Sequence, residues 1–97
     1  MSADAERTMR IGEIDTIGFS FYGDDLPSGV TISSGTLSVS PASGLTLQDE
    51  DAVVIGDGSA LYGWVTAVTA GEYDVTFTIN FSDSKTLKRV YRVTVIS

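Results

Sequence analysis

The feature that most constrains this sequence is an unbroken alternation of apolar and polar residues over residues 73–81. Apolar side chains occupy every odd position from Tyr73 to Phe81, and polar side chains occupy every even position. Successive side chains of a β-strand point to opposite faces, so this period of two predicts a strand with one buried face. The closing stretch, residues 86–96, repeats the pattern, with Tyr91 among the side chains expected to point inward. These two stretches predict a β-sheet core.

Turn residues divide the rest of the chain into further short strands. Clusters of Gly, Ser, Asp and Pro recur at intervals of about 8 to 12 residues, which is typical of β-sandwiches and barrels. We expect strands over residues 15–22, 30–33, 36–40, 45–48, 52–55, 61–68, 73–81 and 86–96. The sequence therefore predicts an all-β, immunoglobulin-like β-sandwich of about seven antiparallel strands. In that architecture Tyr73 occupies the place of a tyrosine whose hydroxyl bonds back to nearby backbone.

The length of 97 residues indicates one domain. Residues 1–12 precede the first expected strand, and we interpret them as an extended N-terminal arm in front of a sandwich domain over residues 13–97. No segment approaches the roughly 20 apolar residues of a membrane span, and residues 1–7 lack the apolar core of a signal peptide. We therefore expect synthesis in a cytoplasm and no membrane partner.

The composition argues against several classes of function. The chain has no Cys and no His, which removes thiol nucleophiles, imidazole bases and the usual zinc ligands. We expect no enzymatic activity and no cofactor. The net charge of −7 argues against a nucleic-acid partner, because such proteins need a basic footprint.

The basic residues are confined to the two ends of the sequence, and no Lys or Arg occurs from Ile11 to Ser84. One interpretation is chance combined with solubility. The other is a bipolar surface, with an acidic body, a basic edge and a basic arm, which suits self-association or docking on a charged assembly. The six basic residues are Arg7, Arg10, Lys85, Lys88, Arg89 and Arg92.

The strand expected over residues 61–68 is apolar on both faces, so its orientation stays open. If Leu61 and Val65 point inward, Tyr62 and Trp64 form an exposed patch that suits a protein interface or stacking on a sugar. In the other register Trp64 lies in the core, as in many immunoglobulin-like folds, and we favour this register.

Acidic residues offer a candidate cation site near the middle of the chain. Asp49, Glu50, Asp51 and Asp57 carry the hard oxygen ligands that calcium prefers, but none of the loops has the spacing of an EF-hand. We favour a solvated acidic loop over a metal site.

Several short stretches resemble a known family. They are residues 26–32, 37–39, 44–46, 63–65, 70–75 and 86–95. In these stretches the chain is similar to small immunoglobulin-like proteins encoded in the structural modules of tailed bacteriophages. The resemblance implies a virion structural protein, and we favour a capsid decoration or cement protein on the outer surface of the phage head. The implied partners are the major capsid protein and neighbouring copies of the chain, with synthesis in the host cytoplasm.

The mechanism that we expect from this resemblance is clamping of adjacent capsid subunits. The arm would contribute Arg7, Met9 and Arg10, so removal of residues 1–10 would weaken capsid binding and leave the domain folded. The other expected contact residues, on a basic edge and on one sandwich face, are Lys85, Lys88, Arg89, Arg92 and Tyr62. The alternatives are a tail or neck component of the same fold, and a carbohydrate- or cell-surface-binding immunoglobulin-like module.

Overall fold

The two strongly alternating stretches of the sequence form the longest hairpin of the computed structural model. β7 (Gly71–Phe81) and β8 (Thr86–Ile96) pair antiparallel, with Val75 opposite Tyr91. Val75 is fully buried and Tyr91 is 8% exposed. The inward orientation predicted from the alternation is therefore confirmed.

Eight strands build two sheets in the part of the chain that the structure describes, which is residues 4–21, 29–41, 43–56 and 58–97. Sheet A has the strand order β1-β8-β7-β3, and sheet B has the order β2-β6-β4, with β5 also paired to β6. The other six strands are β1 (Ala5–Arg10), β2 (Ile14–Ser20), β3 (Ile32–Ser40), β4 (Leu45–Leu47), β5 (Val53–Ile55) and β6 (Ala60–Ala67).

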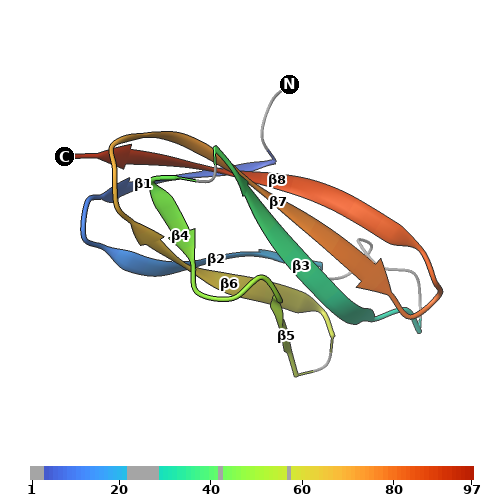
Figure 1. The fold of residues 1–97 in the computed structure, drawn as a ribbon. Helices are drawn as coiled ribbons and strands as arrows, with labels where there is room; N and C mark the ends of the chain where they lie inside the picture. Colours follow the sequence, from blue (N-terminus) through green and yellow to red (C-terminus); the bar gives the residue numbers. More distant parts are fainter. Residues whose placement is uncertain (1–3, 22–28, 42, 57) are drawn as a thin grey trace.

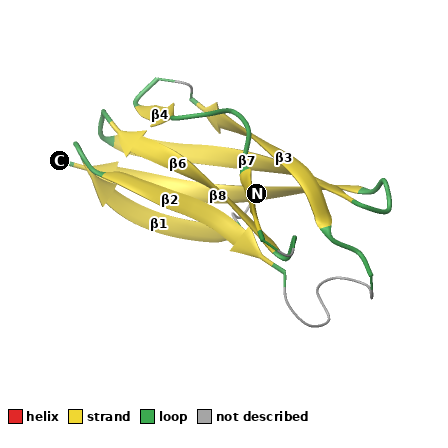
Figure 2. Ribbon diagram, turned by 90° about the horizontal axis from the view of Figure 1, so that it is seen from below, coloured by secondary structure: helices red, strands yellow, loops and turns green. Residues whose placement is uncertain are grey.

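The architecture is the predicted all-β, immunoglobulin-like sandwich, with eight strands where about seven were expected. One pair, β1 with β8, is parallel, whereas only antiparallel strands were expected. Figure 1 shows the strands of the two sheets along the chain, and Figure 2 shows strands and loops without a helix in the described residues. No helix there is long and apolar enough to cross a bilayer.

The strands expected over residues 30–33 and 36–40 are one continuous strand, β3, with an irregular register between Ile32 and Ser34. Tyr22, at the end of another expected strand, lies outside the described residues.

The core lies between the two sheets and is centred on aromatic side chains. The ring of Phe19 meets Phe77 edge-on at a centroid distance of 5.1 Å and Tyr91 at 5.7 Å. Such pairs contribute about 0.5–1.5 kcal/mol beyond the burial of their area. The other large side chains with almost no exposed surface are Ile17, Leu45, Leu61, Ile79, Val65, Val75 and Val93.

Tyr73 has the role that the sequence predicted. Its hydroxyl donates a hydrogen bond to the carbonyl oxygen of Thr69 at 2.7 Å. Gly44 makes room for this ring, because a Cβ on Gly44 would lie 2.0 Å from the tyrosine hydroxyl oxygen. The φ of Gly44 is +105°, in the region that favours glycine over residues with side chains.

The expected N-terminal arm is a strand of the sandwich. β1 pairs parallel with β8 from Ala5, opposite Tyr91, to Arg10, opposite Ile96. Met9 is only 2% exposed and belongs to the core. The physical reason is that β1 provides partners for backbone groups on the outer edge of β8 and an apolar side chain for the core. Residues 5–10 are therefore part of the folded body and not a separate arm.

Arg7 connects the two sheets where β1 and β2 lie on the same side of the sandwich. Its Nη1 pairs with the carboxylate of Asp15 and donates to the carbonyl oxygen of Thr16, the latter at 3.0 Å. The side chains of Arg7 and Asp15 are 39% and 49% exposed, so solvent screens this pair. These contacts nevertheless hold the guanidinium of Arg7 against β2.

We predict that Met9→Ala destabilises the sandwich by about 2–5 kcal/mol, because it removes a buried side chain and leaves a cavity. The free energy of urea-induced unfolding measures this change. Thr8→Ala is the matched control, since Thr8 is the exposed neighbour on the same strand, and its effect should stay within about 0.5 kcal/mol. Equal stability of the two variants would show that β1 does not contribute to the core.

Candidate apolar docking face

The outer face of sheet B carries an exposed row of large apolar side chains. We call it the apolar face and define it by Ile14, Val53, Ile55, Tyr62 and Trp64. Val53 and Ile55 are each 46% exposed, Trp64 is 43% exposed and Ile14 is 62% exposed. The strand register places Tyr62 opposite Val53, and the rings of Tyr62 and Trp64 meet edge-on at 6.5 Å. Neighbouring exposed apolar side chains of this size are typical of interaction surfaces.

The expectation of a buried Trp64 is wrong, and the packing of β6 gives the reason. Leu61 and Val65 point inward and are almost completely buried. Gly63 lies between them on the inner face, where a Cβ would come within 2.6 Å of the Leu37 side chain. Leu37 thus fills the space under Gly63, and the alternation of the strand leaves Trp64 on the outside.

The outer face of sheet A is polar by comparison. The β3 residues Ser34, Thr36 and Ser38 lie opposite Asn80, Thr78 and Thr76 of β7. These positions follow the usual alternation of apolar-in and polar-out side chains in a sheet with one solvated face. The outer face of sheet B departs from that pattern, which makes it the stronger candidate for a contact surface.

A hollow beside Trp64 results from a break in the strand opposite β6. β4 pairs with the end of β6 and β5 pairs with its start. The N–H of Gln48 still donates to the carbonyl oxygen of Trp64 on β6, but residues 50–52 bond to β3. The N–H of Leu37 donates to the carbonyl oxygen of Glu50 at 2.7 Å, and the N–H of Ala52 donates to that of Gly35 at 2.9 Å. This segment therefore crosses from sheet B to sheet A and leaves a gap along β6.

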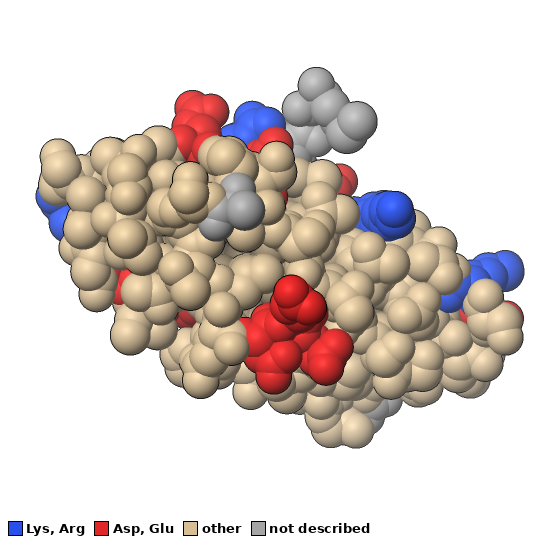
Figure 3. Space-filling view, viewed as in Figure 1, with Lys and Arg blue, Asp and Glu red and all other residues tan. Residues whose placement is uncertain are grey.

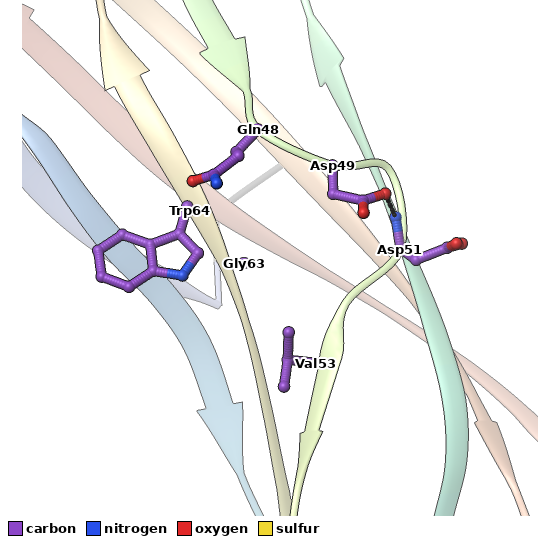
Figure 4. Close-up of a pocket in the computed structure, with 6 residues that line it drawn as sticks. All are labelled: Gln48, Asp49, Asp51, Val53, Gly63 and Trp64. Carbon is purple, nitrogen blue, oxygen red and sulfur yellow. Dashed lines mark hydrogen bonds between the residues drawn. The ribbon is translucent and has the colours of Figure 1, made fainter.

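The hollow has a volume of about 320 Å³ and is lined by Gln48, Asp49, Asp51, Val53, Gly63 and Trp64. Figure 4 shows the indole on one side, Asp49 and Asp51 on the other side, with the carboxylate of Asp51 directed away from the indole, and the amide of Gln48 at one end. Asp49 Oδ1 accepts a hydrogen bond from the N–H of Asp51 at 3.0 Å. The hollow thus combines an aromatic wall with several hydrogen-bond acceptors.

The acidic residues expected as a candidate calcium site lie next to this hollow. In Figure 3 acidic side chains gather over the connection between β4 and β5, apart from the Lys and Arg side chains. Among the described residues no group of three or more acidic side chains is arranged to hold a metal ion. Asp57, the fourth expected ligand, lies outside the described residues.

The contact residues expected on the arm have roles within the fold. Met9 is a core residue, so its expected contact with a partner is wrong. Arg7 bonds to Asp15 and Thr16. Arg10 Nη1 donates to the carbonyl oxygen of Ser97 at 3.3 Å.

The residues expected to form one basic edge do not share one face. Arg92 bonds to both carboxylate oxygens of Asp74, at 2.9 and 3.5 Å, and this hydrogen bond and the charge of Asp74 raise the pKa of Arg92. Arg89 lies on the opposite side of β8 and donates to the carbonyl oxygen of Lys88 at 3.0 Å. Lys85 lies 3.9 Å from Asp83 in the hairpin turn.

The other expected contact residue, Tyr62, does lie on the apolar face, where it is half-buried. Sequence reasoning missed the aliphatic members of this face, Ile14, Val53 and Ile55. The sequence does contain a signal for Val53 and Ile55. Residues 53–55 are all aliphatic, so any strand there must turn at least one large apolar side chain outward.

Comparison with known proteins supports the fold and leaves the family open. No family model and no curated protein matches the sequence. Among solved structures, the chain is similar to the PKD domain from the KIAA 1837 protein. This match covers 97% of this chain and 82% of that chain, with a TM-score of 0.59 and 16% identity. A second match, to a cysteine protease inhibitor from Entamoeba histolytica, covers 97% of this chain and 87% of the inhibitor chain, with a TM-score of 0.53 and 11% identity.

Domains 4 and 5 of the S-layer protein SbsC also match the sandwich. This match covers 99% of the chain and 50% of that structure, with a TM-score of 0.52 and 19% identity. At such low identities all three similarities establish the immunoglobulin-like fold alone.

We predict that Trp64 fluoresces as a solvent-exposed indole. It is the only Trp in the chain, so emission and quenching report on this site alone. Emission should lie close to that of free tryptophan, and acrylamide should quench it readily in the folded protein. A blue-shifted emission that resists acrylamide would place Trp64 in the core and contradict the apolar face.

Proposed function

We propose that the chain is a non-enzymatic virion structural protein that docks through its apolar face. The assembly that we favour is the outer surface of a phage head, where the chain would act as a capsid decoration protein. The resemblance of the sequence to phage structural proteins suggests this class of assembly. The observation that carries the docking role is the exposed row of Trp64, Val53 and Ile55 on the outer face of sheet B.

The composition of the apolar face supports a role in protein contact. Energetically important interface residues are enriched in Trp and Tyr, and they are surrounded by side chains that exclude water. Trp64 and Tyr62 occupy the centre of sheet B on β6, with Val53 beside them and Ile14 on the strand at the other side. A rigid sheet presents this row without the entropy cost of ordering a loop.

The proposed mechanism differs from clamping by an N-terminal arm. Residues 5–10 are engaged with β8, and the guanidinium of Arg7 is held on β2. Stabilisation of the particle would instead come from many copies, each covering a repeated site of the shell. Multivalent coverage of this kind raises the total binding strength without a tight individual contact. Neighbouring copies on the shell are the second proposed partner.

A tail or neck position is an alternative within the same proposal, because the apolar face could dock on those structures equally well. A carbohydrate- or cell-surface-binding module is a second candidate. It is favoured by the exposure of Trp64 beside the polar groups of Gln48 and Asp49.

We predict that Ile55→Glu weakens binding to the particle by more than about tenfold, because docking would bury an unpaired charge at an apolar contact. The measurement is co-sedimentation of the purified chain with separated heads and tails of the phage that carries it. Ser38→Glu, at an exposed strand position on the outer face of sheet A, should bind as the unmodified chain does. Binding to tails alone would exclude the head, and loss of binding only with Ser38→Glu would contradict the apolar face.

A further inference from the structure

We propose that the hollow beside Trp64 accepts an arginine side chain presented by the docking partner. This inference rests on the proposed docking role and names the chemistry that the apolar face would recognise. The hollow lies within that face, because Trp64 and Val53 belong to both.

The size of the hollow suits one side chain better than a large ligand. Its volume of about 320 Å³ is at the lower end of the range of roughly 300–1,000 Å³ for small-molecule sites. The hollow lies beside the outward-pointing side chains of Trp64 and Val53 on the outer face of sheet B. A side chain projecting from an approaching surface can therefore enter while the surface itself rests on Val53 and Ile55.

The charge of the hollow favours a cation. Asp49 and Asp51 line it, and Glu50 lies between them in the sequence. Every Lys and Arg of the chain lies in the described residues, and none of them forms an ion pair with these three acids. These three acids thus have no Lys or Arg partner among the residues that the structure describes, and an acidic or phosphorylated ligand would be repelled.

The chemistry of the lining distinguishes arginine from other ligands. A guanidinium is planar and weakly hydrated, packs against aromatic rings and offers five N–H donors that match carboxylates. The acceptors that border the hollow are the carboxylate of Asp49 and the amide oxygen of Gln48, whereas Figure 4 shows the carboxylate of Asp51 directed away from Trp64. Hydrogen bonds to ionised groups are about twice as strong as those between neutral groups, which favours arginine over a neutral sugar. The apolar stem of the arginine can pack on Val53.

The indole of Trp64 provides the most direct test. The chain has one Trp, so its indole N–H gives one signal in a proton–nitrogen correlation spectrum. Titration with N-acetyl-L-arginine methylamide should shift this signal in a saturable way, with a dissociation constant on the order of 1 mM. N-acetyl-L-citrulline methylamide has the same shape without the charge and should bind at least about tenfold more weakly.

Substitutions of the acidic residues test whether the arginine probe binds in the hollow. Asp49→Asn should weaken binding of the arginine probe by about fivefold or more, through loss of a charge-assisted hydrogen bond. Glu72→Gln is the matched control, since it removes one negative charge at an exposed position of β7 in sheet A, and it should leave the affinity unchanged. Equal weakening by Glu72→Gln would reveal a general charge effect and overturn the proposal.

The remaining outcomes separate this inference from the proposed function. Equal binding of the citrulline probe, or binding of methyl glucosides and not of the arginine probe, would overturn the arginine site. If the arginine probe fails while Ile55→Glu still abolishes docking on the particle, the docking role holds without this anchor. If the probe binds and the chain associates with neither heads nor tails, the hollow is an arginine site that serves another partner, and the proposed function fails.

Discussion

The arrangement of this sandwich depends on a change of hydrogen-bond partner at residues 50–52. This segment leaves β6 and bonds to β3, where it satisfies the N–H of Leu37 and the carbonyl of Gly35. Backbone groups beside a core must be paired, so the crossing closes one open side of the two layers. The same crossing ends the pairing of this segment with β6 after the bond from Gln48 to Trp64, and the hollow forms beside Gly63. The segment that closes this side of the core therefore also creates the hollow of the candidate site.

Much of the fold could be predicted because its signals are local. The alternation of residues 73–81 and the hydrogen bond of Tyr73 follow from strand geometry and the entry turn alone. The parallel pairing of β1 could not be predicted in the same way. The partner of Arg10 is Ile96, at the other end of the chain, and no pattern within residues 5–10 identifies that edge. Burial of Met9 depends on this distant pairing.

The candidate site was predictable only in part, for a related reason. The faces of β6 are both apolar, so periodicity allows either orientation, and the choice is made by Leu37 packing under Gly63. The exposed Trp64 was one of two alternatives, whereas the hollow follows from a sheet crossing that has no sequence signature. The basic residues are confined to the two ends of the sequence, yet in the fold Arg92 is paired with Asp74 across the hairpin.

The parallel pairing of β1 with β8 also has a mechanical consequence. The first strand and the last strand of the chain lie side by side and run in the same direction, from Ala5 beside Tyr91 to Arg10 beside Ile96. A force that pulls the two termini apart therefore slides one strand along the other and strains all the hydrogen bonds between them at once. Strands that peel apart from one end break these bonds one after another and yield at lower load. The topology thus equips a small domain without disulfides to resist tension applied through its ends.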